Sequence, residues 1–360
     1  MDEEPFAPNN PRGYTGKLND PGFRKGILSG EAAEREVAAY LIDSEGFYSV
    51  PMTVYVEMMG FKSNGIKKGS MQSFVNHSDV AGNFGTGLFS AKEVHKLGIL
   101  DLRLLNCDRN ENNVLIQKNK NSVKMIPIDH GLCLPDCIEI YDYEIVWMSW
   151  PQSHEAFSSE ELEHILNIDV HKDLKLLRSR LNIREKSLRN YLAVNILLKQ
   201  AAFYGFTLHQ IGTMVYRMQE DEPSLLQKIL KQSRELNKRM KGLISNSEDK
   251  SNCVYKELIV EEKDFEGKLE RLSTTDEQYE SFAEKNTFEK LLLKRRASDP
   301  EIMESLDKAM EEKKGKKKKK NEKKEGFDEG FLRYYDSLLK QELEKMRLKA
   351  RSRYFSSEFL

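Results

Sequence analysis

The chain has 360 residues and is 39% hydrophobic, which is enough for a buried core in one large domain or two ordinary ones. Its formal net charge of −1 is unevenly spread, because residues 313–324 hold nine lysines and one acid. The acidic start MDEEP argues against a secretory signal, and polar residues interrupt the most apolar helical stretch, 191–211, which excludes a membrane span.

The first part of the chain predicts a small mixed lobe. Residues 5–30 contain four prolines and five glycines, which favour a loop. Residues 31–43 place apolar side chains at helical spacing, and residues 52–58 are rich in Thr, Val and Tyr, which favours a strand. Asn64-Gly65 and Lys68-Gly69 are typical of turns, so we expect a linker after this strand.

The second part predicts a mostly helical lobe that follows a β-hairpin. Gly82, Gly85 and Gly87 indicate a loop before a helix over 90–97. Two short apolar strands, 114–117 and 123–128, flank the turn-prone KNKN and predict the hairpin. Helical patterns then follow over residues 160–166, 174–180, 184–204 and 208–218.

Residues 108–113, which read DRNENN, carry the first chemical signal. Phosphoryl transfer needs a group that orients the attacking hydroxyl, and oxygen ligands that hold magnesium on the β- and γ-phosphates. Asp108 and Asn113 have the D-x-x-x-x-N spacing of a kinase catalytic loop. Such pairs are common, and taken alone this one also fits a capped turn.

The predicted hairpin strengthens this signal. Asn113 leads into its first strand and Asp129 ends its second, so the hairpin folds these two residues together. Asp129-His130-Gly131 then stands where a kinase has D-F-G, with Asp129 able to ligate magnesium and Gly131 permitting a tight backbone bend. His130 replaces the usual Phe.

Two longer blocks resemble a known family. Residues 97–109 read LGILDLRLLNCDR and residues 126–135 read IPIDHGLCLP. Together they closely resemble the phosphatidylinositol 3- and 4-kinase catalytic domain. The runs DEEPFAPNNP at 2–11 and REVAAY at 35–40 look like the plant-type γ phosphatidylinositol 4-kinases, a branch related to the type II enzymes. The likeness covers residues 2–218.

This resemblance implies an α+β, two-lobed protein-kinase-like fold that uses ATP and Mg. It implies that Asp108 is the catalytic-loop acid, in a catalytic group with Arg109 and Asn113. It also implies that Asn113 and Asp129 hold magnesium. The implied cofactor-binding residues are Glu36 in the lobe-bridging helix, the linker residues Gln72, Ser73, Phe74 and Val75, whose backbone would meet adenine, and Asp129.

One departure from the family bears on activity. In the family, the glycine-rich strand pair and the ATP-binding lysine lie upstream of the segment that resembles residues 2–5, so we expect this chain to lack them. Lys17 and Lys25 lie in a loop and are poor substitutes. Without that lysine, charge stabilisation on the α- and β-phosphates is lost. The abrupt start favours an incomplete gene product over a degraded kinase.

We expect four segments. They are a catalytic domain over 1–220 with an incomplete N-lobe, a charged helical region over 221–310, a lysine-rich linker over 311–326 and an amphipathic C-terminal helix over 327–360. The apolar positions of the last helix, which predict packing or self-association, are Leu332, Tyr335, Leu339, Leu343 and Met346. The lysine run favours a solvated linker, with an anionic membrane surface, nuclear targeting or nucleic-acid contact as alternatives.

The remaining features carry their own expectations. Trp147 and Trp150 are core residues by default, with membrane contact as the alternative. The four cysteines lack the pairing of a zinc site and predict reduced thiols. We expect a cytoplasmic protein that can lie peripheral to membranes and has no nucleic-acid partner.

Three functions follow. The leading one is a phosphatidylinositol 4-kinase that transfers phosphate from ATP, with Mg, to the inositol 4-hydroxyl. The second is the same machinery acting on Ser or Thr of a protein. The third is a catalytically impaired scaffold, favoured by the missing lysine.

Overall fold

The computed structural model describes residues 17–59, 66–119, 122–246 and 329–357. Contacts divide the chain into two compact units, Met1–Leu236 with Gly326–Leu360, and Asn237–Glu325. The described part of the second unit is residues 237–246, at the end of helix α7. The lysine run 313–324, Cys253 and most of the expected region 221–310 lie outside the described residues, so the expectations about them stay predictions.

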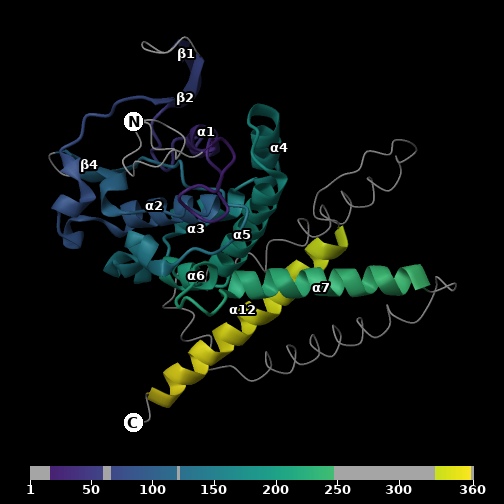
Figure 1. Ribbon diagram of the computed structural model, residues 1–360. Helices are drawn as coiled ribbons and strands as arrows, with labels where there is room; N and C mark the ends of the chain where they lie inside the picture. The colour runs from purple at the N-terminus through teal and green to yellow at the C-terminus, as the bar shows by residue number, and fades with distance from the viewer. Residues whose placement is uncertain (1–16, 60–65, 120–121, 247–328, 358–360) are drawn as a thin grey trace. The chain divides into compact units, whose positions relative to one another are not determined.

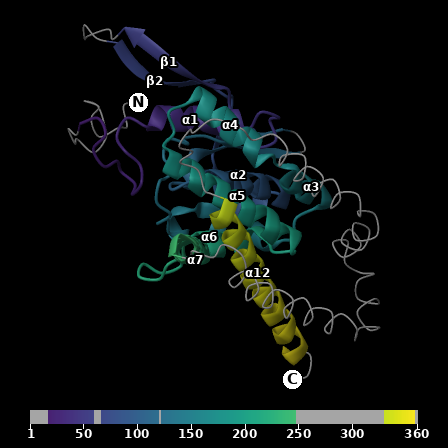
Figure 2. The same ribbon diagram turned by 90° about the vertical axis from the view of Figure 1, so that its right-hand side faces the viewer.

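The first unit begins with helix α1 (Ala32–Ile42) and an antiparallel pair of strands, β1 (Thr53–Met59) and β2 (Ile66–Gln72). This strand pair stands out from the helical body (Figures 1 and 2). The helix over 31–43 and the strand over 52–58 are confirmed. The expected turn at Lys68-Gly69 is wrong, because both residues lie inside β2. Lys68 lies opposite Glu57 and forms an ion pair with it at 2.8 Å, so cross-strand pairing outweighs local turn preference.

A three-stranded antiparallel sheet comes next, in the order β3-β4-β5. Its strands are β3 (Asp79–Val80), β4 (Val114–Lys118) and β5 (Val123–Pro127). The predicted hairpin is confirmed, with Val114 paired to Pro127 at its base and Lys118 to Val123 near its tip. Alternate side chains of β4, Val114 and Ile116, are buried, which anchors one face of the hairpin to the core.

Helix α2 (Ala91–Leu104) is at the centre of the helical part. Ser90 caps it by accepting a hydrogen bond from the Glu93 backbone N–H at 3.3 Å. The helix was expected over 90–97, but it continues to Leu104, because its second half is buried on every side. It ends at Leu105, whose φ of 50° is left-handed.

The other four predicted helices are confirmed. They are α3 (Ser159–Asn167), α4 (Val170–Arg180), α5 (Glu185–Phe203) and α6 (Leu208–Val215). Trp147 and Trp150, which precede them, are 0% and 2% exposed, so the alternative of membrane contact is wrong and core packing is confirmed. Within the described residues, no helix combines the length and the apolar character needed to cross a bilayer.

Two further helices complete the description, α7 (Leu225–Asn246) and α12 (Glu329–Ser357). Helix α12 (yellow in Figures 1 and 2) packs on α5, and the Tyr335 hydroxyl donates to the Ala193 carbonyl at 2.8 Å. The packing expected for this helix is confirmed, although the buried face begins at Phe331 in place of Leu332. The fold as a whole is mixed α/β, with most of its core in helices.

Candidate active site

Arg109 joins the loop that follows α2 to the hairpin. Its Nε donates to Asp101 at 3.0 Å, in an ion pair that is wholly buried. Its Nη1 donates to the carbonyls of Asn113 at 2.6 Å and Ile128 at 2.8 Å, the two residues at the base of the hairpin. Arg109 was predicted as part of the catalytic group. The structure places it beneath the loop, where it holds the backbone of both halves of the site.

Asp101 is the common acceptor under this loop. Besides Arg109, it accepts hydrogen bonds from Asn106 Nδ2 at 2.9 Å and Trp147 Nε1 at 3.0 Å. A loop conformation that broke these bonds would leave the buried charge of Asp101 uncompensated, which is costly. The three donors therefore favour one arrangement of the loop. Asp101 could not be found from the sequence, because an Asp inside an apolar helix has no recognisable motif of its own.

The structure brings Asp108, Asn113 and Asp129 into one site. Asn113 Nδ2 donates to the Asp108 carbonyl at 3.0 Å, which fixes the side-chain amide. The backbone N–H of Ile128 donates to the Asn113 carbonyl at 3.1 Å, so Asp129 directly follows a residue bonded to Asn113. The backbone around Asp108, Asn113 and Asp129 is therefore close together at the base of the hairpin, and the catalytic roles predicted for the three residues stay predictions.

The tight backbone conformation occurs at Asp129, with φ of 57°, and not at Gly131 as expected. Gly131 is needed for a different reason. A Cβ added there would lie 3.2 Å from Cβ of Ala32 on α1, so glycine lets that helix approach the loop closely. Asp129 adopts a conformation that Asp tolerates better than most residues. The backbone on either side of it is fixed by the hydrogen bonds that the N–H groups of Ile128 and Gly131 donate.

Glu36 on α1 belongs to this site. Its Oε1 accepts from the Gly131 backbone N–H at 2.9 Å, and its Oε2 lies 3.7 Å from His130 Nδ1. The His130 ring is 0% exposed, and neither ring nitrogen has a hydrogen-bond partner. Glu36 thus ties α1 to the segment that carries Asp129.

The predicted adenine linker, Gln72 to Val75, connects the two sheets. It starts at the end of β2, where the Ser73 N–H donates to the Met52 carbonyl at 2.8 Å. The side chain of Phe74 is 82% exposed. Its expected contact with adenine stays a prediction.

Arg24 is a second residue near the predicted site that no sequence motif indicated. Its Nη2 donates to Asp108 Oδ1 at 2.7 Å and its Nη1 to Glu144 Oε1 at 2.5 Å. Burial alone would lower the pKa of Arg24, but the hydrogen bond to Asp108 and the charges of Glu144 and Asp108 raise it above its ordinary value. No sequence signal indicates this contact, because Arg24 lies in a Pro- and Gly-containing stretch 84 residues before Asp108 and 120 before Glu144.

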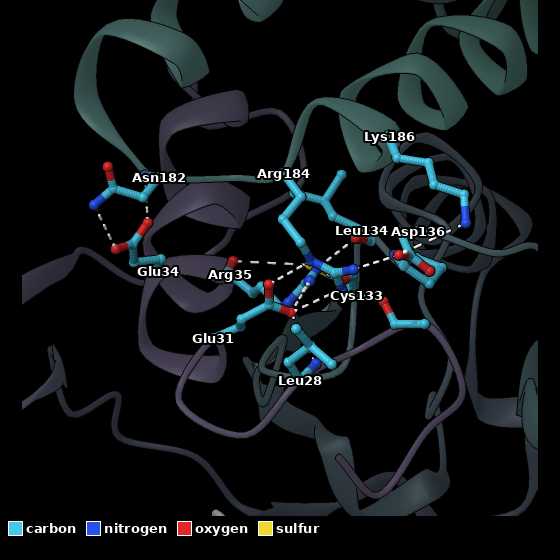
Figure 3. A network of polar contacts seen from close by, with 12 residues as sticks. Leu28, Glu31, Glu34, Arg35, Cys133, Leu134, Asp136, Asn182, Arg184 and Lys186 are labelled. Carbon is cyan, nitrogen blue, oxygen red and sulfur yellow. Dashed lines mark hydrogen bonds and ion pairs between the residues drawn. The ribbon is translucent and has the colours of Figure 1, made fainter. Parts of the chain in front are cut away.

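A second cluster of charges fixes α1 and the chain before it (Figure 3). Arg184, just before α5, reaches Glu31 with Nε at 2.6 Å and also pairs with Asp136. Glu31 in turn accepts from Arg35, whose guanidinium donates to the carbonyls of Cys133 and Leu134. These bonds join α1 to the segment that follows Gly131.

The oxygen atoms of this site suit a magnesium ion. Mg²⁺ prefers carboxylate and amide oxygens, and it usually takes one or two protein ligands and completes its shell with phosphate and water. Asp129 offers a carboxylate, and the Asn113 amide is already oriented by its bond to the Asp108 carbonyl. The residues therefore fit the metal that phosphoryl transfer requires.

An acid and an amide on one loop, joined by a hairpin to a second acid, are the arrangement expected of a kinase catalytic loop and its magnesium-binding acid. Comparison with known proteins gives the same class. The family model of phosphatidylinositol 3- and 4-kinases matches residues 1–211, more than half of the chain. The chain belongs to this family.

Several curated plant proteins have similar sequences. The chain is 40% identical over 283 residues to phosphatidylinositol 4-kinase gamma 6 of Arabidopsis thaliana, which covers 71% of this chain and 45% of that protein. It is 42% identical to gamma 7 of the same plant, over 63% of this chain and 38% of that protein. It is 36% identical to gamma 4 of Oryza sativa subsp. japonica, over 65% of this chain and 43% of that protein. The chain thus spans less than half the length of these relatives.

Proposed function

We propose that this chain is an ATP- and Mg-dependent phosphotransferase that phosphorylates the 4-hydroxyl of phosphatidylinositol. The observation that carries this proposal is the convergence of Asp108, Asn113 and Asp129 at the base of one hairpin. The relatives named phosphatidylinositol 4-kinase support the choice of acceptor.

In this proposal Asp108 accepts a hydrogen bond from the acceptor hydroxyl and takes its proton as the hydroxyl oxygen bonds to the γ-phosphorus. The bond between that phosphorus and the β–γ bridging oxygen breaks, and its electron pair leaves with ADP. Asn113 and Asp129 would hold magnesium, which neutralises charge on the β- and γ-phosphates. Arg109 and Asp101 keep the loop and hairpin in register.

The nucleotide would lie between two lobes. We assign β1, β2 and α1 to the smaller lobe, with Glu36 facing the segment that carries Asp129 and the backbone of residues 72–75 meeting adenine. The helices from α2 onward form the larger lobe. We further propose a cytoplasmic location at the periphery of anionic membranes, where each basic residue near the surface contributes about 1 kcal/mol and the lysine run is the basic element.

The test is a phosphorylation assay on the full chain. Wild-type protein and Asp108→Asn are incubated with MgATP and phosphatidylinositol vesicles, and the labelled product is identified as the 4-phosphate. Asp108→Asn should lower turnover on the order of 10²- to 10⁴-fold, because the base that takes the hydroxyl proton is lost. Asp221→Asn, an exposed Asp outside the site, is the matched control and should retain full turnover.

A parallel arm replaces the vesicles with a protein acceptor. Phosphate on Ser or Thr without lipid product would replace the lipid acceptor by a protein one and keep the same residues. Nucleotide binding without transfer to either acceptor would favour the impaired scaffold. Full turnover in Asp108→Asn would refute the role of Asp108.

A further inference from the structure

Arg24 lies near the tip of a small loop structure formed by residues 19–29. An antiparallel bridge joins Pro21 to Leu28, and the Gly22 N–H donates to the Ile27 carbonyl at 2.8 Å. Inside this closure, the Ile27 N–H donates to the Arg24 carbonyl at 3.2 Å. The backbone that carries Arg24 is therefore a hydrogen-bonded turn with a defined direction.

This turn is fastened to the rest of the unit at Gly26. The Gly26 carbonyl accepts from the Asp136 N–H at 2.9 Å and from Arg184 Nη2 at 2.7 Å. Gly26 has a φ of +84°, and a Cβ added there would lie 2.8 Å from the Cys137 nitrogen. Only glycine allows so close an approach. The charge cluster of Figure 3 thus sets the position of Arg24 as well as that of α1.

The side chain of Arg24 is held between two carboxylates with different surroundings. The Glu144 side chain is 11% exposed and its Oε2 also accepts from the Tyr141 N–H at 3.1 Å, so it is fixed from its own side. The Asp108 side chain is 30% exposed, as is that of Arg24. Glu144 therefore acts as the anchor, while the Arg24–Asp108 pair opens toward solvent.

This geometry leaves hydrogen-bonding capacity on both partners. A guanidinium has five N–H donors, and the contacts to Asp108 and Glu144 use two of its nitrogens. A carboxylate has about four acceptor sites, and Arg24 contacts Oδ1 of Asp108. Asp108 can thus accept an acceptor hydroxyl while it remains paired with Arg24.

We propose that Arg24 binds the phosphoryl group during its transfer. The inference rests on the proposed function, in which Asp108 holds the hydroxyl whose oxygen attacks the γ-phosphorus. Because the attacking oxygen is one hydrogen bond from Asp108, a cation paired with Asp108 lies beside the phosphoryl oxygens. Arginines that reach a transferring phosphoryl group stabilise the charge spread over its equatorial oxygens. Glu144 supplies the fixed anchor that keeps Arg24 there.

The test compares Arg24→Ala with Lys25→Ala in the full chain. Lys25 is the adjacent cation on the same turn and pairs with Glu139, so its removal changes the charge equally but away from Asp108. Both variants are assayed for turnover with MgATP and for binding of MgADP with and without aluminium fluoride, which mimics the phosphoryl group in transfer. Arg24→Lys keeps the charge, and Glu144→Gln keeps Arg24 but removes its anchor.

Arg24→Ala should lower kcat on the order of 10²- to 10³-fold with less than about a threefold change in the KM for ATP. Aluminium fluoride should lower the Kd for MgADP in wild type, and in Arg24→Ala this decrease should be at least about tenfold smaller. Lys25→Ala should match wild type, while Arg24→Lys and Glu144→Gln should fall between.

Three results would overturn this inference. The first is faster turnover in Arg24→Ala, which would mean that the ion pair restrains Asp108. The second is an equal loss of turnover in Arg24→Ala and Lys25→Ala. The third is an unchanged effect of aluminium fluoride on MgADP binding in Arg24→Ala. If Arg24→Ala does not fold by circular dichroism, Glu144→Gln and Arg24→Lys decide the question by the same two readouts. Failure of wild-type protein to bind MgADP would instead overturn the proposed function, and this inference with it.

Discussion

At the scale of single residues, the pKa of His164 is shifted by its burial and by the nearby buried cation Arg103. Its ring stacks on Phe47 with centroids 3.6 Å apart, and its Nε2 lies 2.8 Å from the Tyr48 hydroxyl. That hydroxyl accepts from Arg103, which also donates to Asp173 at 2.7 Å. Burial, together with the charge of Arg103, lowers the pKa of His164 from 6.5 to about 4.

This shift predicts a pH dependence of stability. Between pH 6.5 and about 4 the unfolded chain binds a proton at His164 that the folded chain does not. The free energy of unfolding should therefore fall as pH drops through this range, by about 1–2 kcal/mol from this group between about pH 7 and about pH 5. Urea denaturation at the two pH values measures the difference.

His164→Gln removes the titrating group and keeps an acceptor for Tyr48, so it should reduce that difference. His171→Gln, at an exposed position of α4, is the matched control and should leave it unchanged. An equal pH dependence in wild type and His164→Gln would show that other groups cause it.

At the scale of elements, what the sequence predicts depends on how far apart the partners lie in the chain. Asp108, Asn113 and Asp129 are joined by one hairpin, and the apolar strands around KNKN were enough to place them together. Arg24 and Glu144 come from distant segments, and nothing local marks them as partners. Strand β2 was missed for a different reason: it lies close to β1 in the chain, but the local turn preference of Lys68-Gly69 was outweighed by its pairing with β1.

The turn over residues 19–29 should depend on Arg184, which binds Gly26, Glu31 and Asp136 at once. Arg184→Ala removes these bonds, so the amides of this turn should exchange hydrogen faster, by about tenfold for each 1.4 kcal/mol of local stability lost. Hydrogen–deuterium exchange with peptide analysis measures the rate.

Arg178→Ala is the control, because Arg178 forms an exposed pair with Glu185, and such pairs contribute little to stability. Unchanged exchange at residues 19–29 in Arg184→Ala would mean that the turn is held by its backbone bonds alone.

At the scale of the whole molecule, helix α12 contributes to the same core as the candidate active site. Residues 247–328 separate it in sequence from α7, yet α12 belongs to the unit that contains residues 1–236. Its buried side chains recur every fourth residue, at Phe331, Tyr335, Leu339 and Leu343. This spacing matches one face of a helix, and the contact with α5 links that face to the helices around α2. Helix α12 is therefore structurally part of the first unit.

The stability of the first unit should consequently depend on leucines of α12 according to their burial. Leu339 is 0% exposed and Leu348, on the same helix, is 42% exposed. Leu339→Ala should lower the free energy of unfolding by about 2–5 kcal/mol, because it leaves a cavity where the helix packs. Leu348→Ala should change it by less than about 0.5 kcal/mol. Urea denaturation followed by tryptophan fluorescence reports on the core directly, since Trp147 and Trp150 are buried there. If Leu339→Ala left this transition unchanged, α12 would be a dispensable appendage, and the packing of Tyr335 on α5 would contribute little to the fold.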